Sequence, residues 1–286
     1  MKSPIVLGMP EAEYHAHPAL SSSGARKLVP PSTPAAFDWE RKNPSPPTAA
    51  MRLGRAVHRE VLGIGSEIVV GQYPNYRTKE SQQWRDAQEA DGLIPLLAES
   101  ATWTAIQGMA KALRAHPVFG QVFDPERGDG EASLFWTDPE TNVPCRARLD
   151  FLPNRVKGRR LVVPDYKSTG KSANPREFAR DAATYGYPQQ DGWYRGGLKA
   201  IGLDRDPQFV FVVQETKPPY LIGIHQVSAS DAALANGLNR RARHAFAHCT
   251  ATGEWPGYGN GVHQLEMPTW WRINSEALID ESETAA

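Results

Sequence analysis

The sequence has little cysteine: its 286 residues include only Cys145 and Cys249. Two thiols cannot build a disulfide-rich scaffold, a four-thiolate zinc centre or a four-thiolate iron–sulfur cluster. Two thiols are enough for one disulfide, so this alternative remains. The N-terminus, however, lacks the pattern of a signal peptide, because Gly8 and Pro10 interrupt its short apolar run. We therefore expect a protein of the reducing cytoplasm.

Long hydrophobic runs are also missing. The longest purely apolar stretch, Phe209–Val213, is far shorter than the roughly 20 residues that a membrane helix needs. The chain shows no internal repeat and no low-complexity tract. Forty per cent hydrophobic and 22% charged residues are typical of a globular protein, and the length suits one large domain or two small ones. We expect no membrane partner.

Net charge is the third absence, since 32 Lys and Arg balance 32 Asp and Glu. A balanced chain is unlike a non-specific nucleic-acid coat protein, whose whole surface is basic. A local basic groove remains compatible with zero net charge if acidic residues elsewhere offset it. The charge therefore excludes a basic coat and leaves a confined nucleic-acid site open.

The order of predicted elements indicates an α/β (α+β) fold. The first half is mainly helical, with proline turns between short helices, and five strands and two helical segments follow. The predicted helices cover residues 21–29, 34–42, 48–62, 81–115 (divided at Pro95), 175–201 and 229–249. A short strand is expected within 66–80, and the five later strands cover 132–137, 144–152, 160–167, 208–214 and 220–227. This order predicts one central mixed sheet flanked by helices.

The residue types of a metal site gather on two predicted neighbouring strands. Asp165 and Lys167 alternate with Tyr166, so both point from one face of their strand. Asp150 lies on the preceding strand and can approach Asp165, and two close carboxylates repel unless a cation lies between them. Hard oxygen ligands suit Mg²⁺ or Mn²⁺. An alternative for this spacing alone is a surface salt bridge between Asp165 and Lys167.

Two helical pairs strengthen the metal-site interpretation. Gly54 and His58 lie four residues apart on the helix over 48–62, where an imidazole can add a ligand and nearby arginines suit an anionic partner. Gln190 and Tyr194 share a helix face and can contact a phosphate or a base. Each pair also has a plain structural alternative: an ordinary helical histidine and a core tyrosine.

These segments in this order resemble a known family. LSSSGARKL, PTAAMRLGRAVHREVLG, CRARLDFLP, DYKST and YPQQDGWY are similar to segments of the PD-(D/E)xK nucleases. Within the RecB-like branch, the chain most resembles phage and prophage exonucleases of the RecE (exonuclease VIII) type. One departure is visible, because Leu149 precedes Asp150 while Pro164 precedes Asp165.

The resemblance implies a set of roles. The metal ligands would be His58, Asp150 and Asp165, and Lys167 would orient the attacking water. The substrate strand would be held by Gln190 and Tyr194. Glu131, at the start of a strand, is a further catalytic candidate, with a solvated strand-end carboxylate as the alternative. The DNA-binding candidates added from local charge are Arg52, Arg55, Arg146 and Arg148.

The resemblance also implies a reaction and an assembly. The expected activity is Mg²⁺-dependent 5′–3′ hydrolysis of linear double-stranded DNA, leaving 3′ single-stranded tails for recombination by strand annealing, with Mn²⁺ as a substitute. Expected partners are DNA ends, a RecT-type annealing protein and further copies in a ring, such as a tetramer, in a phage-infected or prophage-bearing bacterial cell. Alternatives are an endonuclease or single-strand-specific nuclease of the same branch, or an inactive DNA-end binding module. The intact Asp150, Asp165 and Lys167 count against the last.

We expect one nuclease domain over residues 1–286. It divides into an N-terminal extension (1–47), a catalytic core (48–250) and a C-terminal extension with an acidic tail (251–286). Six basic residues and one acid lie between 143 and 160, and Arg240, Arg241 and Arg243 form a second basic group whose simplest reading is an exposed helix face. If DNA is the substrate, the basic residues of the site should line one concave surface leading to Asp165.

Overall fold

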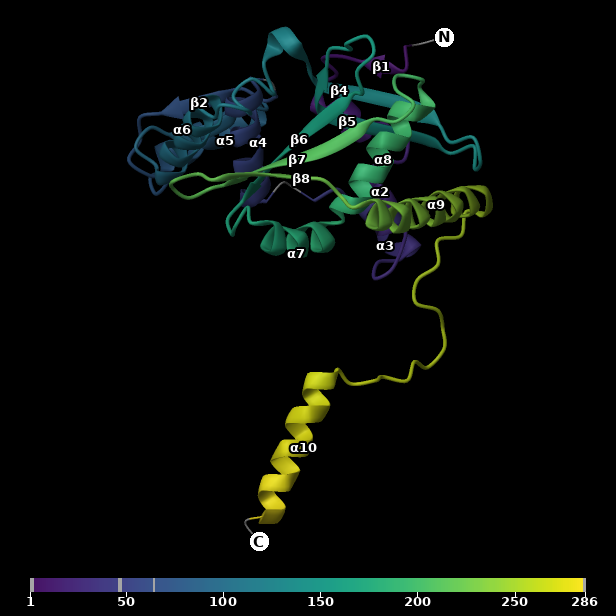
Figure 1. Cartoon of the computed structure of the whole chain (residues 1–286). Helices are drawn as coiled ribbons and strands as arrows, with labels where there is room; N and C mark the ends of the chain where they lie inside the picture. The colour runs from purple at the N-terminus through teal and green to yellow at the C-terminus, as the bar shows by residue number, and fades with distance from the viewer. Residues whose placement is uncertain (1–2, 46–47, 64, 285–286) are drawn as a thin grey trace. The chain divides into compact units, whose positions relative to one another are not determined.

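A computed structural model describes residues 3–45, 48–63 and 65–284 (Figure 1). From the N-terminus the elements are β1 (Ile5–Val6), α1 (Glu11–Ala16), α2 (Ser22–Lys27), α3 (Pro34–Lys42), α4 (Ala49–Leu62), β2 (Ile68–Gly71), α5 (Lys79–Ala90), β3 (Ile94–Leu97) and α6 (Ala101–Arg114). A 3-10 turn at Pro125–Arg127 leads into β4 (Gly128–Thr137), β5 (Pro144–Pro153), β6 (Val162–Thr169), α7 (Pro175–Tyr185), α8 (Tyr187–Ala200), β7 (Gln208–Glu215), β8 (Ile222–His225), α9 (Ala229–Thr252) and α10 (Thr269–Thr284).

Helix α4 shows how local sequence sets the element that carries His58. The Thr48 hydroxyl accepts a hydrogen bond from Met51 N at 3.2 Å, which caps the first turn. At the other end Gly63 adopts a left-handed φ of 71°, a conformation that glycine tolerates without steric cost. The predicted helix over 48–62, its cap and its closing glycine are therefore confirmed.

The strands form three sheets. Strands β4 and β5 make an antiparallel hairpin that β1 joins, β6 and β7 are parallel with β8 antiparallel beside them, and β2 and β3 form a separate parallel pair. The α+β class is confirmed, but the single central mixed sheet is not what the hydrogen bonds show. A physical reason lies between β5 and β6, where Asp150 Oδ2 accepts the hydrogen bond of Tyr166 N at 2.7 Å. A side chain thus takes a backbone donor that a continuous ladder would use.

Strand β3 was not predicted. We expected Pro95 to separate two helices within 81–115, whereas it lies inside β3 and pairs with Val69 of the parallel strand β2. Both strands of a two-stranded sheet are edge strands, and an edge strand tolerates a proline because one of its sides has no partner strand to receive a hydrogen bond. Helices α5 and α6 flank this strand, so the predicted helices exist but lie further apart along the chain.

Two hydrophobic clusters enclose β6 and β7. Val163, Phe211 and Val213 pack into the larger cluster, with α2, α8 and α9. The alternate residues Tyr166 and Val212 pack into the second cluster, which α4 and α6 cover. In Figure 1 these strands run between the α4–α6 group and helix α8. Because both faces of these strands are buried, we expect polar functional groups toward their C-terminal ends.

Residues 20–28 of the expected N-terminal extension take part in the main core. Leu20, Ala25 and Leu28 are buried in the larger cluster, and Leu20 exchanges backbone hydrogen bonds with β5. The chain divides into two compact units, Met1–Trp255 and Pro256–Ala286. The expected boundaries after residues 47 and 250 stay a prediction.

The second unit contains one helix, α10, in a region where the sequence predicted only turns and an acidic tail. Trp270, Trp271 and Ile273 of this helix are exposed. Among the residues that the structure describes, no helix combines the length and the apolar character needed to cross a bilayer.

A buried acid on α8 predicts a pH dependence of stability. Asp191 is 1% exposed, and burial raises its pKa from 3.8 to about 6 although Arg195 Nε lies 3.2 Å from its carboxylate. The folded state therefore holds this proton more tightly than the unfolded chain does. The stability that Asp191 contributes is fully present below about pH 3.8 and is lost as the pH rises through about 6.

We expect Asp191→Asn to remove this part of the pH dependence. Urea unfolding at pH 4.5, 6 and 8 should give a wild-type free energy of unfolding that falls, relative to the variant, over this range. Equal pH profiles for the two proteins would contradict the assignment.

Candidate active site

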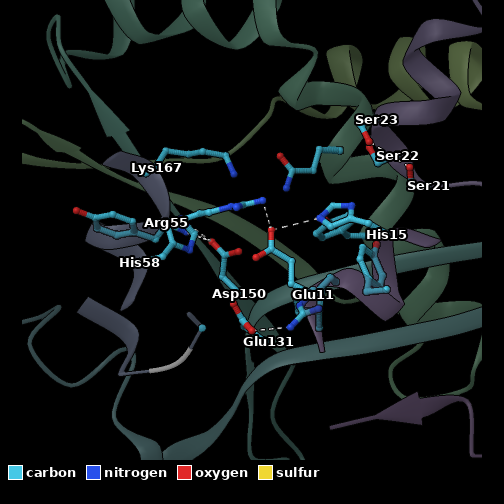
Figure 2. A pocket seen from close by; sticks show the side chains of 18 of the residues that line it. Glu11, His15, Ser21, Ser22, Ser23, Arg55, His58, Glu131, Asp150 and Lys167 are labelled. Carbon is cyan, nitrogen blue, oxygen red and sulfur yellow. Dashed lines mark hydrogen bonds and ion pairs between the residues drawn. The ribbon is translucent and has the colours of Figure 1, made fainter. Parts of the chain in front are cut away.

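A cleft of about 590 Å³ brings together residues from α1, α2, α4, β4, β5, β6 and α8 (Figure 2). The cleft is lined by nine of the predicted site residues: Arg55, His58, Glu131, Arg146, Arg148, Asp150, Lys167, Gln190 and Tyr194. Asp165 is 1% exposed and does not line the open surface. Arg52 is exposed on α4 and does not line the cleft either. Gly54 forms part of the wall, where a Cβ would meet no atom within 4 Å, so this stretch of α4 leaves open space.

The pair Asp165 and Lys167 lies at the base of the cleft. Alternation along β6 places both side chains on one face, and Lys167 Nζ forms an ion pair with Asp165 Oδ2. Gln190 Nε2 of α8 donates a hydrogen bond of 2.9 Å to the other oxygen, Asp165 Oδ1. The side chain of Lys167 is only 18% exposed, so the ammonium is held beside the carboxylate and is not free in solvent.

Asp150 is fixed from β5 to the same place. Its Oδ2 accepts the hydrogen bond from Tyr166 N, and His58 Nε2 of α4 lies 3.9 Å from that oxygen. The His58 ring meets the Tyr166 ring edge-on at 5.5 Å, which holds the imidazole against the second hydrophobic cluster. Tyr166 of β6 therefore anchors both groups: its backbone N–H holds the carboxylate of Asp150, and its ring holds the imidazole of His58.

Two carboxylates, Asp150 and Asp165, share the site with one ammonium, that of Lys167. Burial and the nearby charge of Asp150 raise the pKa of Asp165 to about 7, against the opposing effect of Lys167. Burial lowers the pKa of Lys167, but the charges of Asp165 and Asp150 outweigh this effect and leave the pKa above its usual value. The lysine thus stays protonated, while the second negative charge is incompletely compensated.

A divalent cation fits this imbalance. Members of the PD-(D/E)xK superfamily generally use divalent metal ions. Here the donors are two hard carboxylates and one imidazole, and the ammonium of Lys167 pairs with Asp165 Oδ2. Within the described part of the chain, however, no group of three or more His, Cys, Asp or Glu side chains is arranged closely enough to hold a metal. The structure joins His58 to Asp150 and Asp150 to Tyr166 N, and the full set of three ligands stays a prediction.

Glu131 lies opposite Asp150 in the β4–β5 hairpin. The ladder pairs Gly130 with Phe151 and Ala132 with Leu149, and the pair between them is missing. At this point Glu131 adopts φ 50°, a left-handed conformation that is costly for a residue with a side chain. Its carboxylate lines the cleft and pairs with Arg148 Nη2 at 2.5 Å. This strained backbone beside the acids supports a functional role for Glu131, which the sequence offered as one of two readings.

Arginines of β5 hold the N-terminal helix against the cleft. Arg146 Nη2 donates to His15 O at 3.3 Å and Arg148 Nη2 to Met9 O at 2.9 Å, while both guanidinium groups lie over the Tyr14 ring. Arg146 is 8% exposed. Both side chains therefore have protein partners on α1 and its approach, and contact of either with DNA stays a prediction.

Sequence reasoning missed the contribution of α1. Glu11 pairs with Arg55 Nη2 at 2.6 Å and lies 3.5 Å from His15 Nε2, as Figure 2 shows. These side chains join Ser21–Ser23 and Arg26 of the α2 region in the cleft wall. No spacing rule links residues 11–26 to β5 and α4, because the contact depends on how the N-terminal segment folds back over the hairpin.

Gln190 and Tyr194 share one face of α8, as predicted. Gln190 is turned toward Asp165, and Tyr194 packs edge-on against Phe209 at 5.4 Å. Burial raises the pKa of Tyr194 well above its usual value, so its hydroxyl stays a neutral hydrogen-bonding group. Contact of either residue with a substrate strand stays a prediction.

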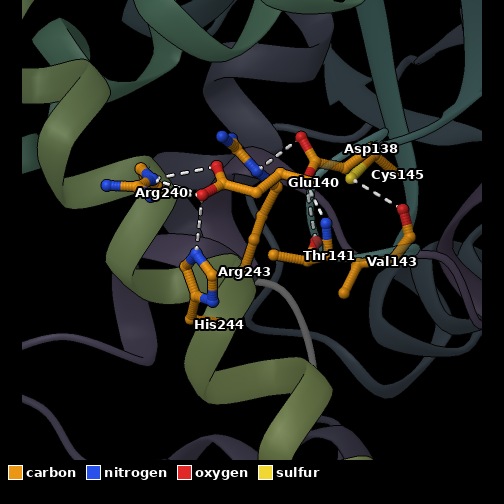
Figure 3. Close-up of polar contacts among 8 residues, drawn as sticks. All are labelled: Asp138, Glu140, Thr141, Val143, Cys145, Arg240, Arg243 and His244. Atoms are coloured by element: carbon orange, nitrogen blue, oxygen red, sulfur yellow. Dashed lines mark hydrogen bonds and ion pairs between the residues drawn. The ribbon is translucent and has the colours of Figure 1, made fainter.

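The other basic groups lie outside the cleft. Arg240 of α9 pairs with Glu140, and Arg243 Nε lies 2.9 Å from Asp138, both acids of the β4–β5 turn (Figure 3). Arg155 pairs with Asp204 at 2.5 Å. These charges hold turns to neighbouring elements, and the positive charge of the cleft comes from Arg26, Arg55, Arg146, Arg148 and Lys167.

Two solved structures and one family model are similar to this chain. A solved structure from Eubacterium rectale, named "Putative exonuclease", has a TM-score of 0.55 at 12% identity and covers 91% of this chain and 94% of its own. A phage related exonuclease from Haemophilus somnus 129PT covers 83% of this chain and 97% of its own at 11% identity, with a TM-score of 0.33. No curated protein sequence matches.

A family model described as "PDDEXK-like domain of unknown function (DUF3799)" matches residues 33–266. That span contains β4, β5 and β6 with Asp150, Asp165 and Lys167, and the helices that carry His58 and Gln190. The first solved structure shares the fold over most of both chains. The chain belongs to the PDDEXK-like family, and its fold is that of a PD-(D/E)xK nuclease.

Proposed function

We propose that the protein is a Mg²⁺-dependent exodeoxyribonuclease that degrades linear double-stranded DNA from a 5′ end and leaves 3′ single-stranded tails. The observation that carries the proposal is the buried Asp165–Lys167 pair with Asp150 at the base of a cleft bordered by basic side chains. The 5′ polarity, the 3′ tails and the use in recombination rest on the RecE-type resemblance. The printed name of the similar structure from Eubacterium rectale, "Putative exonuclease", supports exonuclease over endonuclease action.

The chemistry is hydrolysis of a phosphodiester. A water oxygen attacks phosphorus, the bond from phosphorus to the 3′ oxygen breaks, and the water proton passes to the departing oxygen by way of solvent. Lys167 Nζ orients the attacking water by donating a hydrogen bond, since its raised pKa keeps it protonated. A bound Mg²⁺ or Mn²⁺, held by Asp150, Asp165 and His58, would stabilise charge on the phosphoryl oxygens. Gln190 keeps Asp165 in its orientation.

The assembly is part of the same proposal. A ring of several copies, such as a tetramer, would surround the duplex and keep the enzyme on its track, and a RecT-type protein would coat the exposed 3′ strand. Both partners rest on the resemblance. A ring needs positive potential only along its inner wall, which suits a chain of zero net charge whose cleft arginines are gathered at one place.

Arg55 and Arg240 offer a matched pair for testing where DNA lies. Arg55 lines the cleft, whereas Arg240 holds the β4–β5 turn outside it. Arg55→Ala should weaken DNA binding uniformly across sequences and reduce the slope of log K against log salt by about 1. Arg240→Ala should leave both values unchanged. Fluorescence anisotropy over a salt series measures them, and equal losses for the two variants would place DNA outside the cleft.

The deciding experiment for the activity compares linear duplex DNA with covalently closed circles, both in Mg²⁺. Labels on each 5′ and 3′ end report polarity. We expect digestion of the linear duplex, with early release of the 5′ label and persistence of a 3′ single strand. Digestion of closed circles would indicate an endonuclease. Failure to degrade either substrate, in Mg²⁺ and in Mn²⁺, would indicate the DNA-end binding module.

A further inference from the structure

Five tyrosines line the cleft, and one of them differs from the others in exposure. Tyr14 and Tyr166 are buried, and Tyr187 and Tyr194 are half-buried. Tyr185 is 52% exposed, although it too belongs to the cleft wall. A single exposed aromatic on an outer surface needs no explanation, but an exposed ring inside a site bordered by basic side chains can contact a ligand.

Tyr185 is the outer member of a run of rings that begins in the core. Phe211 is 2% exposed and stacks on Tyr187 at 5.4 Å, with 28° between the rings. Tyr187 lies 5.8 Å from Tyr185, with 30° between the rings. The near-parallel planes extend a buried stack outward to an exposed ring. Such a surface offers a flat partner to another flat group.

The turn that carries Tyr185 is held in place. Tyr185 ends α7, and Gly186 follows it with a left-handed φ of 70°. A Cβ on Gly186 would lie 2.4 Å from Cδ of the Arg26 side chain. Helix α7 before this turn and α8 after it fix the backbone that carries Tyr185, which lowers the entropy that a contact would cost.

The same stack reaches the reactive lysine. Lys167 Nζ lies 5.2 Å from the centre of the Tyr187 ring, and the next ring outward is Tyr185. The distance from Lys167 Nζ to the Tyr187 ring and the distance from that ring to Tyr185 add up to a span of at most about three base steps of ~3.4 Å along one strand. A base that meets Tyr185 would thus belong to a nucleotide within about three of the phosphate beside Lys167.

We propose that Tyr185 is a substrate-positioning residue that stacks on a nucleobase close to the scissile phosphate. This inference rests on the proposed nuclease function and names the part of the substrate that the cleft holds besides phosphate. Every base has a flat face, so stacking suits an enzyme that degrades DNA of any sequence. Phosphate contacts alone fix the backbone, whereas a stacked base also fixes the nucleotide's rotation about it.

The first measurement is binding without divalent metal, so that it does not depend on cleavage. A linear duplex carries 2-aminopurine at each of the first four positions in turn from the 5′ end. Wild type and Tyr185→Phe should quench the fluorescence at one or two of these positions, because both keep a ring to stack. Tyr185→Ala should lose that quenching and bind about tenfold more weakly. Trp39→Ala, which removes a 63% exposed ring of α3 that does not line the cleft, should behave as wild type.

The second measurement separates stacking from a structural effect. An abasic site placed at the quenched position should raise the KM of wild type about tenfold, and Tyr185→Ala should raise it no further on that substrate. Equal tenfold losses on intact and abasic DNA, or full quenching by Tyr185→Ala, would overturn the inference. Wild-type protein that binds with quenching but cleaves neither substrate would refute the nuclease function and leave the stacking contact supported.

Discussion

Lys167→Met loses about a hundredfold to ten-thousandfold in the rate of cleavage of linear duplex DNA, while the protein still folds and still binds DNA. Methionine keeps the volume of the side-chain stem but cannot donate a hydrogen bond to the attacking water, and a positioned proton donor or acceptor contributes about 10²–10⁴ to a rate. Single-turnover cleavage of an end-labelled duplex measures the loss. Circular dichroism and anisotropy confirm the fold and the binding.

Lys171→Met is the matched control. Lys171 lies four residues further along and pairs with Asp181 at 2.5 Å, but its side chain is 70% exposed and it does not line the cleft. Removing this ammonium changes the charge by the same amount without touching the reactive group. Near-native turnover by Lys167→Met, or an equal loss in both variants, would show that Lys167 does not act on the reacting water.

Local patterns predicted the elements that carry the chemistry. Alternation along an apolar strand placed Asp165 and Lys167 on one face, and the structure joins them as an ion pair. Helical spacing placed Gln190 and Tyr194 on one face of α8, and both line the cleft. These successes share a cause: each depends on one element, whose period is 2 or 3.6 residues whatever surrounds it.

The parts that sequence could not predict depend on how distant segments pack. Nothing within residues 9–16 indicates that Arg146 and Arg148 will hold their backbone carbonyls and the Tyr14 ring. Between the β4–β5 hairpin and the β6–β7 sheet, Asp150 accepts the hydrogen bond of Tyr166 N, and strand periodicity contains no information about this contact. Helix α10 is amphipathic only weakly and was taken for a tail.

Local charge was a poorer guide than local periodicity. The arginines of α9 and those after β5 are as dense in sequence as those of the cleft, yet Arg240, Arg243 and Arg155 pair with acids of neighbouring turns. Arg55 and Arg148 of the cleft pair with carboxylates as well, so pairing alone does not separate the two groups. A run of like charge therefore predicts a surface, and only the fold shows whether that surface borders the cleft.

Asp165→Asn abolishes cleavage and also removes the stabilisation of the fold by divalent metal. In wild type, burial and the nearby charge of Asp150 raise the pKa of Asp165 to about 7, and a cation that binds between the acids offsets both effects. A ligand present at 100 times its Kd adds about 2.7 kcal/mol, which for a unit of this size raises the Tm by roughly 5–10 °C. Asparagine keeps the shape of the side chain and can still accept the hydrogen bond from Gln190, so the variant should fold. Thermal unfolding with and without Mn²⁺ measures the shift.

The control for this result is Asp181→Asn, because Asp181 is also a buried carboxylate paired with a lysine but lies outside the cleft. It should keep the full shift with Mn²⁺, and it should keep cleavage. Without metal, Asp165→Asn should unfold at a higher temperature than wild type at pH 8, since it lacks a buried charge that Asp150 repels. A full Mn²⁺ shift in Asp165→Asn would mean that the cation binds away from this carboxylate, and the proposed ligand set would then have to exclude it.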